Sequence, residues 1–372
     1  MSTQPMPTDC FRKRLPTGSA TAEEFGWLQV AGRLQVPALL GRTQVDSDTD
    51  VITYEDVFAS GRCQLLLGDL IALADDDLAT TGQVASLIDA VCDDLIAQAA
   101  QTGRTVPLSG CVPTLYADRI RPGGRVDTWY LHRGLTVTDT YTGDPIPVRT
   151  LTGYTATVNG TALSLDLPAT IQLARAALHP DRQWASAITQ GDPTEPNIAT
   201  SADGACWLDF EHAGRNTLPG DIANLLWYLL ALGGWLVPTY QSDVYTRTLP
   251  LHRPPAAAPA VEHAELSARH RRLDLHYTWP SGSGRRTALT QVLARLATDL
   301  GDAAGLPSGR QLEALRPFLA LRILGVIPPS LLTTADLLLV LAKLAEAQHL
   351  HDHDQFTRTA LQPAFTTTLE RP

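Results

Sequence analysis

Residues 190–211, QGDPTEPNIATSADGACWLDFE, carry oxygen-bearing side chains at spacings that suit phosphate chemistry. The Asp-Gly pair at the centre is a strong hairpin signal, with strand-forming residues on either side. Strands that pair about this turn bring Asn197 and Asp209 nearly opposite each other, which is a workable start for a Mg²⁺ site. Asp192, on a loop restrained by proline, would lie beside that metal and accept a proton from an incoming hydroxyl.

The same residues also suit a purely structural role. Gly, Asp, Pro and Asn are the residues of any tight turn, and a lone DxxxxN is common. Because a short motif has a high false-positive rate, it needs support from its surroundings. The hairpin and the apolar-flanked CWLDFE supply that support and favour chemistry.

The N-terminal part is predicted to combine strands with one helix. Strands are predicted for three segments: residues 10–15, 35–45 and 50–58. Residues 17–32, TGSATAEEFGWLQVAG, are predicted to form a helix with Ser19 or Thr21 as its N-cap.

Two further segments are predicted to be helices. In residues 83–101 the apolar side chains return at intervals of three and four. Residues 222–238 are the most apolar run, but they contain a Gly pair and fall short of the roughly 20 residues that a membrane-spanning helix needs. We therefore expect a buried core helix there and no membrane partner.

Residues 112–166 differ in character from their surroundings. Gly-Gly and Asn-Gly turns separate alternating segments, which predicts hairpins and hence a β-rich insertion. Its first half clusters three arginines and two aromatic residues: Arg119, Arg121, Arg125, Trp129 and Tyr130. These side chains could hold an anionic or aromatic group, although such charge runs are more often a solvated hairpin tip.

Composition limits the class of protein. A chain of 372 residues with 44% hydrophobic residues is globular and long enough for two lobes. Its net charge of −10 argues against a nucleic-acid partner, because phosphate backbones select basic patches. The five cysteines are far apart, which fits a cytoplasmic protein. Only two lysines occur; Lys343 fits a solvated helix position, and Lys13 has an ordinary surface role as its simplest interpretation.

GDPTEPN, the hairpin and LDFE resemble the catalytic loop and metal-binding segment of the aminoglycoside phosphotransferase and choline/fructosamine kinase superfamily, the small-molecule relatives of protein kinases. The family pattern is roughly HGDxxxxN, a short hairpin, and DxE or DxD. The resemblance implies an α+β, bilobal protein-kinase-like fold that uses ATP and Mg²⁺. It gives Asp192 as the catalytic base, Asn197 and Asp209 as Mg²⁺ ligands, and Glu211 as a further acidic position. Asp221 matches the aspartate that opens the next helix, where a simple N-cap is the preferred role.

The resemblance extends more weakly upstream. Lys13 is similar to the strand lysine that binds ATP phosphates, and a glutamate on the next helix is its expected partner. Glu23, with a glycine three residues on, is slightly preferred to Glu24. Residues 54–57 correspond to the hinge whose backbone binds adenine. The hinge residues named by the resemblance are Tyr54, Glu55 and Val57.

Two departures from the family pattern stand out. Gln190 replaces the usual histidine, which in the family is mainly a structural support. Twelve residues precede Lys13, whereas two strands with a phosphate-covering loop need at least about fifteen to twenty. We therefore expect a short N-terminal lobe over residues 1–57 without the glycine-rich hairpin, and a mostly helical lobe over residues 58–372 that includes the insertion.

The function implied is transfer of the γ-phosphoryl group of ATP to a hydroxyl of a small molecule, such as an aminoglycoside, a choline-like or sugar-like compound, or a natural-product intermediate. A Ser or Thr of a peptide is an alternative acceptor. A pseudokinase that serves as a binding or scaffold protein is a second alternative, because the glycine-rich loop is missing. A metal-dependent hydrolase using Asp192, Asp209 and Glu211 ranks last. The oligomeric state stays open.

Overall fold

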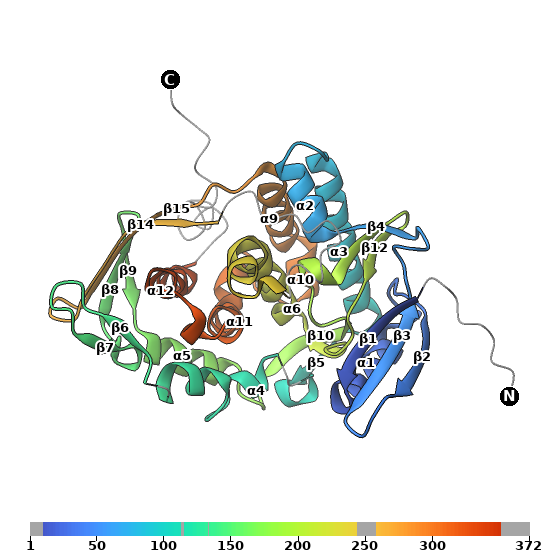
Figure 1. Cartoon of the computed structure of the whole chain (residues 1–372), viewed down its shortest axis with the longest axis horizontal. Coiled ribbons are helices and arrows are strands. Elements are labelled where there is room, and N and C mark those ends of the chain that lie inside the picture. The colour runs from blue at the N-terminus through green and yellow to red at the C-terminus, as the bar shows by residue number, and fades with distance from the viewer. Residues whose placement is uncertain (1–9, 113–114, 133, 244–257, 351–372) are drawn as a thin grey trace, which may run out of the picture.

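The computed structural model describes residues 10–112, 115–132, 134–243 and 258–350. A small N-terminal sheet lies at one end of an elongated molecule, a second sheet lies at the other end, and helices fill the space between them (Figure 1). This is the mixed α+β, two-lobed architecture that the sequence predicts, with a small lobe built on a sheet and a larger, mostly helical lobe.

The N-terminal sheet is antiparallel with the strand order β1-β3-β2. Its strands are β1 (Cys10–Pro16), β2 (Leu39–Gln44) and β3 (Thr49–Glu55). They fall on the three segments predicted as strands, so these predictions are confirmed. Lys13 lies opposite Ile52 of the central strand β3, which fixes where the lysine side chain emerges from the sheet.

Helix α1 (Thr17–Val30) follows β1 without an intervening loop. It therefore begins before Ser19 and Thr21, and the prediction that one of these residues is the N-cap is wrong. Pro16 takes the N-cap position, and no side chain caps the helix there. A proline fixes its own φ and ends β1, so the strand passes into the helix within one residue.

Two more three-stranded sheets lie next to the N-terminal lobe. The first has the order β13-β10-β5: β13 (Gly214–Thr217), β10 (Gln183–Thr189) and β5 (Arg104–Pro107). The second has the order β12-β11-β4: β12 (Gly204–Trp207), β11 (Ile198–Ser201) and β4 (Cys63–Leu66). Strands β11 and β12 pair from Ile198 opposite Trp207 to Ser201 opposite Gly204, which confirms the hairpin at the Asp-Gly pair.

The larger lobe is mainly helical. Its helices are α2 (Leu67–Asp75), α3 (Thr81–Thr102), α9 (Ser283–Leu296), α10 (Asp299–Ala303), α11 (Gln311–Gly325) and α12 (Thr334–Gln348), with a short turn η6 (Pro329–Leu331). Helix α3 covers the predicted segment 83–101. It starts with a capping box, in which Thr80 and Gln83 each bond to the other's backbone.

The most apolar segment runs through the middle of this lobe. It consists of α6 (Leu218–Trp227), a π-helical stretch η5 (Tyr228–Leu236) and α7 (Val237–Tyr240). The segment is long and apolar enough to cross a membrane by composition, but 89% of its most apolar window is buried inside the protein. This burial confirms the prediction of a core helix.

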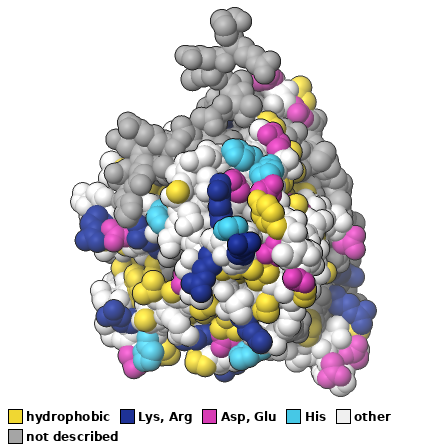
Figure 2. Space-filling model, turned by 90° about the vertical axis from the view of Figure 1, so that its left-hand side faces the viewer, with side chains coloured by type: hydrophobic (Ala, Val, Ile, Leu, Met, Phe, Trp, Pro, Cys, Tyr) yellow, Lys and Arg dark blue, Asp and Glu magenta, His cyan; other side chains and the backbone are white. Residues whose placement is uncertain are grey.

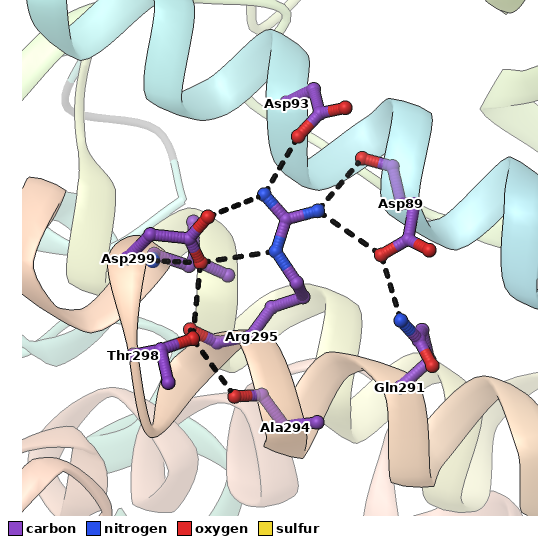
Figure 3. A network of polar contacts seen from close by, with 8 residues as sticks. Asp89, Asp93, Gln291, Ala294, Arg295, Thr298 and Asp299 are labelled. Atoms are coloured by element: carbon purple, nitrogen blue, oxygen red, sulfur yellow. Dashed lines mark hydrogen bonds and ion pairs between the residues drawn. The ribbon is translucent and has the colours of Figure 1, made fainter.

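One arginine holds α3, α9 and α10 together. The Arg295 guanidinium on α9 contacts three carboxylates: Asp89 at 3.0 Å, Asp93 at 2.6 Å and Asp299 at 2.7 Å (Figure 3). Asp89 also accepts a hydrogen bond from Gln291, one turn earlier on α9. Because all five guanidinium N–H groups can be used in a planar fork, one side chain serves three helices.

The first half of the insertion is not the hairpin that the Gly-Gly turn predicted. After the short turn η1 (Leu108–Gly110), which precedes the insertion, its described residues form short helical pieces: α4 (Ala117–Ile120) and the π-helical turn η2 (Asp127–His132). Gly124 lies inside a tight turn, where an added Cβ would be 2.6 Å from the Asp118 carbonyl oxygen and 2.8 Å from that of Arg121. Gly-Gly here permits chain compaction, and the apolar side chains of Ile120, Val126 and Tyr130 point into the core.

The second half of the insertion is β-rich, as predicted. It contains β6 (Thr136–Thr138), β7 (Pro145–Pro147), η3 (Val148–Thr150), β8 (Tyr154–Val158) and β9 (Thr161–Leu165), and it leads into α5 (Leu167–Ala177). The Asn-Gly pair turns β8 into β9, which confirms that hairpin.

A later segment of the chain completes this second sheet. Strands β14 (Ala260–Ser267) and β15 (Arg272–Thr278) give the order β14-β15-β8-β9, with β15 parallel to β8. The sequence pattern predicts no strands in this part of the mostly helical lobe, so it missed this pair. Figure 2 shows the end of the molecule at which the sheet lies, where basic, acidic and histidine side chains lie beside one another among hydrophobic ones.

The expectation that Lys343 is solvated is wrong. The side chain is 1% exposed, and its ammonium lies 2.8 Å from Glu346 Oε2 and over the rings of Tyr277 and Trp279. Helix α12 packs against the four-stranded sheet β14-β15-β8-β9. Lys343, which the sequence pattern places on a polar helix face, therefore lies in the interface between helix and sheet.

Candidate functional site

Three charged residues from distant parts of the sequence meet where the N-terminal sheet faces the β11–β12 hairpin. The Lys13 ammonium on β1 lies 2.8 Å from Glu23 Oε2 on α1 and 2.8 Å from Asp209 Oδ1, just after β12. The Glu23 side chain is 1% exposed, that of Lys13 is 22% exposed and that of Asp209 is 45% exposed. The lysine thus links a buried carboxylate to one that faces solvent.

The charges of these residues depend on one another. Burial and the neighbouring Asp209 charge raise the pKa of Glu23 above its ordinary value. Burial opposes the charged form of Lys13, but Asp209 and Glu23 outweigh it and raise the lysine pKa. Burial also opposes ionisation of Asp209, yet the Lys13 ammonium lowers the pKa of that carboxyl. Lys13 therefore stays protonated and Asp209 stays ionised at neutral pH.

Gly26 lets α1 approach the Asp209 segment closely enough for this contact. A Cβ built at Gly26 would lie 2.0 Å from the Phe210 carbonyl oxygen and 3.1 Å from the Ala213 Cβ. Only glycine leaves room for the backbone there, which gives a structural reason for the glycine three residues after Glu23.

The structure separates the two glutamates that the sequence left as candidates. Glu23 contacts Lys13 and also accepts a hydrogen bond of 3.1 Å from the Tyr54 hydroxyl. Glu24 points elsewhere and pairs with Arg42 at 3.0 Å. Helix geometry places adjacent residues about 100° apart, so only one of them can face the lysine.

The predicted hinge residues lie at and just beyond the end of β3. The backbone N–H of Glu55 donates to the Ala38 carbonyl, and the Val57 carbonyl accepts from the Cys63 N–H. The Tyr54 side chain is buried and directed at Glu23. Among the described residues no hydrogen bond uses the Val57 N–H, so this group is the best placed of the three to meet a ligand.

Asp192 lies in the loop between β10 and the short turn η4 (Glu195–Asn197). The Asn197 amide nitrogen donates to the Asp192 backbone oxygen at 3.0 Å and to Asp192 Oδ2 at 3.3 Å. The Asn224 amide nitrogen donates to Asp192 Oδ1 at 2.5 Å. The Asp192 side chain is 24% exposed. A carboxylate fixed in this way keeps lone pairs available for a proton while its position is set.

Gln190 and Gly191 hold this loop against the Asp209 segment. The Gln190 amide donates to the carbonyl oxygens of Leu208 and Asp209, and its oxygen accepts from the Asp192 N–H at 2.9 Å. Gly191 has φ +85°, and an added Cβ would lie 2.2 Å from the His212 carbonyl oxygen. Gln190 thus makes supporting contacts of the kind expected for that position.

Asn197 and Asp209 are brought to the ends of the two hairpin strands. The Leu208 N–H donates to the Asn197 carbonyl at 2.9 Å, so Asp209 follows directly after the residue opposite Asn197. Asp209 has φ +59°, a left-handed conformation that Asp tolerates better than most residues. This conformation carries the chain away from the hairpin and turns the carboxylate toward Lys13.

The donor chemistry of Asn197 and Asp209 fits Mg²⁺. In the described structure the Asn197 amide uses only its nitrogen for hydrogen bonds, which leaves the oxygen as a ligand. Asp209 presents a half-exposed, ionised carboxylate. Glu211 lies two residues further on and is partly buried. No three His, Cys, Asp or Glu side chains of the described residues form a metal-binding group, so a cation here would rely on the Asn197 amide, the Asp209 carboxylate and the oxygens of a ligand.

Sequence reasoning missed two residues that contact Asp192. Asn224 on α6 donates to it, and Arg322 on α11 lies 3.7 Å from Oδ1. No spacing rule connects them to the loop, because α6 and α11 reach it only through tertiary packing. A buried polar residue inside an otherwise apolar run, as Asn224 is, was the one available signal.

Asp221 is not an N-cap, contrary to the prediction. Thr217 takes that position, and Asp221 is the fourth residue of α6 and fully buried. The Thr189 hydroxyl donates to Asp221 Oδ2 at 2.6 Å, and burial raises the pKa of the carboxyl to about 7. Asp221 therefore ties α6 to the end of β10, directly before the loop that carries Asp192. Trp207 at the end of β12 is 1% exposed and belongs to the core.

No protein-family model and no curated protein matches the chain. Solved structures of related shape include a glucosamine kinase (14% identity, TM-score 0.45, covering 90% of this chain and 72% of that one). They also include a glucosamine kinase with glucosamine, ADP and inorganic phosphate (13%, 0.41, 87% and 69%). A third is aminoglycoside phosphotransferase APH(3'')-Id from Streptomyces rimosus with ADP and streptomycin (13%, 0.41, 86% and 88%).

Proposed function

We propose that the chain is an ATP- and Mg²⁺-dependent phosphotransferase that moves the γ-phosphoryl group to a hydroxyl of a small molecule. The observation that carries the proposal is the Lys13 ammonium held between Glu23 and Asp209, next to a loop that fixes Asp192. Phosphoryl transfer requires mainly positioning and charge neutralisation, and these residues supply both.

Each residue has a distinct role in this proposal. Lys13, oriented by Glu23, binds phosphate oxygens of ATP. Asn197 and Asp209 hold Mg²⁺, with Glu211 as a further acidic group, and the bound cation neutralises charge on the phosphates. The backbone near Tyr54, Glu55 and Val57 receives the adenine. A cytoplasmic location, where thiols stay reduced, fits the five free cysteines.

The reaction balances without another reactant. The acceptor oxygen bonds to the γ-phosphorus while the bond from that phosphorus to the β–γ bridging oxygen breaks, and ADP leaves. Asp192 accepts the proton of the acceptor hydroxyl, since its carboxylate is held by Asn197 and Asn224 with one side open to solvent.

Two substitutions separate nucleotide binding from chemistry. We expect D209A to weaken Mg²⁺-dependent ADP binding, measured by titration calorimetry, by at least about tenfold, because a metal ligand is lost. We expect D192N to bind Mg-ADP like the wild type but to lower turnover about 10²- to 10⁴-fold, because the base is lost. ADP release in the presence of an acceptor panel reports turnover.

Asp203 provides the matched control, since it lies exposed at the turn of the same hairpin. D203N should leave both measurements unchanged. Undiminished Mg-ADP binding by D209A would overturn the assignment. A wild-type protein that binds Mg-ADP but turns over no acceptor would favour the binding or scaffold alternative.

A further inference from the structure

A buried arginine with hydrogen-bond donors that no described residue uses lies directly beside Asp192. Arg322 on α11 is 3% exposed, and one of its terminal nitrogens approaches Asp192 Oδ1 to 3.7 Å. Its Nε and Nη1 atoms are buried and have no hydrogen-bond partner within the described structure. Buried guanidinium nitrogens nearly always donate a hydrogen bond in proteins, so we expect each of these atoms to have an acceptor in the functional state.

Arg119, which lies in the insertion on α4, also has buried nitrogen atoms without a hydrogen-bond partner among the described residues. These atoms are Nε and Nη1. Its Cδ lies 3.6 Å from the position that a Cβ on Gly325 would take, at the end of α11. Arg125 donates to the Gly325 carbonyl at 2.9 Å and stacks over Trp129. Three guanidinium groups therefore gather around the end of α11.

The acidic groups nearby do not balance these arginines. Burial, together with the charges of Arg322 and Arg125, lowers the pKa of Arg119 to about 9. Asp192 faces the cluster, but both of its carboxylate oxygens already accept hydrogen bonds from amides. Burial raises the pKa of Asp221 to about 7, so this carboxyl is only partly ionised at neutral pH. Arg322 could serve simply as a counter-ion to Asp192. That role would not explain why Arg119 has buried nitrogen atoms without hydrogen-bond partners in the described part of the chain.

We propose that Arg119 and Arg322 bind an anionic group of the acceptor, a carboxylate or a phosphate, next to the hydroxyl that Asp192 deprotonates. Guanidinium groups form paired, charge-assisted hydrogen bonds with both kinds of anion. Arg125 borders the same site with Trp129. The acceptor is then an anionic alcohol rather than a neutral or cationic one, and its anionic group keeps its charge through the transfer. This inference rests on the proposed function, because it names the substrate class of that site.

Hexoses that differ in charge test the proposal. The probes are glucuronate, glucose 6-phosphate, glucose and glucosamine, titrated into the protein with Mg-ADP present. We expect glucuronate or glucose 6-phosphate to bind at least about tenfold more tightly than glucose and glucosamine, as a charge-assisted hydrogen bond contributes. The anion that binds more tightly shows whether the site prefers a carboxylate or a phosphate. Tighter binding of glucose or glucosamine, or no saturable binding of either anion, would overturn the proposal.

Substitutions locate the effect. R119Q and R322Q should each weaken binding of the anionic hexose at least about tenfold, whereas R121Q should not. Arg121 is the matched control, since it lies exposed at the end of the same short helix. Equal binding by R119Q, R322Q and R121Q would place the anion elsewhere.

A second measurement does not depend on the variants folding. In the wild-type protein, glucuronate or glucose 6-phosphate should protect Arg119, which is partly exposed, from phenylglyoxal, as mapped by mass spectrometry, and leave Arg121 reactive. An Arg119 that reacts equally with and without the anion would contradict the site. Mg-ADP binding is followed in every sample, so its loss in the wild type would refute the proposed function, whereas loss of anion selectivity alone refutes only this inference.

Discussion

At the scale of single residues, the site is organised by one lysine with two acidic partners of different exposure. Glu23 is buried and is held by Lys13 and the Tyr54 hydroxyl, whereas Asp209 is half exposed. A buried partner with fixed geometry orients the ammonium, and an exposed partner is free to meet a cation. This difference in exposure suits the role proposed for Lys13, which is to hold phosphate oxygens at a set position.

The two neighbouring glutamates allow this division to be tested. E23Q should lower kcat/KM for ATP about 10- to 100-fold, because a neutral amide no longer orients the ammonium by a charge-assisted bond. E24Q should change it little, since Glu24 pairs with Arg42 at the surface. Steady-state ADP release at varied ATP gives both values. Equal losses in the two variants would contradict the role given to Glu23.

At the scale of elements, the site depends on how closely α1 packs on the segment after β12. Gly26 lies against the Phe210 carbonyl oxygen, so the contact is made by backbone and permits no side chain. Tyr54 of β3 and Phe210 pack with ring centroids 5.8 Å apart on the same interface. The Lys13–Glu23–Asp209 contact therefore depends on a fit between two backbones.

Two glycines of the same helix make a matched pair for testing this fit. G26A should cost about 1–3 kcal/mol of unfolding free energy, because the added methyl forces the backbones apart, and should weaken Mg-ADP binding. A Cβ on Gly18 meets nothing within 4 Å, so G18A should be neutral or stabilising by up to about 1 kcal/mol. Urea unfolding and titration calorimetry measure both effects. A stable G26A variant with normal Mg-ADP affinity would show that the close approach is dispensable.

Local signals in the sequence predict the elements that local chemistry decides. The Asp-Gly and Asn-Gly pairs select hairpins, and both hairpins form. The Gly-Gly pair near residue 123 was misinterpreted, because the core-facing side chains around it favour a compact helical turn over a hairpin. The strands β14 and β15 complete a sheet with β8 across more than a hundred residues. Pairing at that separation leaves no short-range signal.

The candidate site shows the same limit. Motif spacing was enough to nominate Asp192, Asn197 and Asp209, because they lie on one loop and one hairpin. Asn224 and Arg322 could not be nominated, since they reach Asp192 from helices that are distant in sequence and are placed by packing of the core. The sequence shows the arginine cluster of the insertion, but its position relative to Asp192 depends on where α11 ends.

At the scale of the whole molecule, a buried ion pair joins helix α12 to the four-stranded sheet that contains β15. Lys343 and Glu346 on α12 lie 2.8 Å apart, and the Tyr277 hydroxyl of β15 contacts both. Burial raises the pKa of Glu346 to about 7, and burial lowers the pKa of Lys343. The N-terminal sheet lies at the other end of the molecule (Figure 1), so this pair serves the fold rather than the candidate site.

A double-mutant cycle tests that assignment. K343M should cost about 3–5 kcal/mol of unfolding free energy at pH 8, because it leaves the Glu346 carboxylate buried without its partner. Below pH 7 the loss should shrink, since the wild-type carboxyl, with its pKa raised to about 7 in the folded state, is itself protonated there, so that removing the ammonium costs less. The double variant K343M/E346L should recover most of the stability at pH 8, as an apolar pair needs no compensation. Urea unfolding at pH 6 and pH 8 supplies the cycle, with Mg-ADP affinity expected to stay unchanged throughout. A K343M loss that is the same at both pH values, or that E346L deepens, would mean that the lysine acts through its packing against Tyr277 and Trp279 and not through its charge.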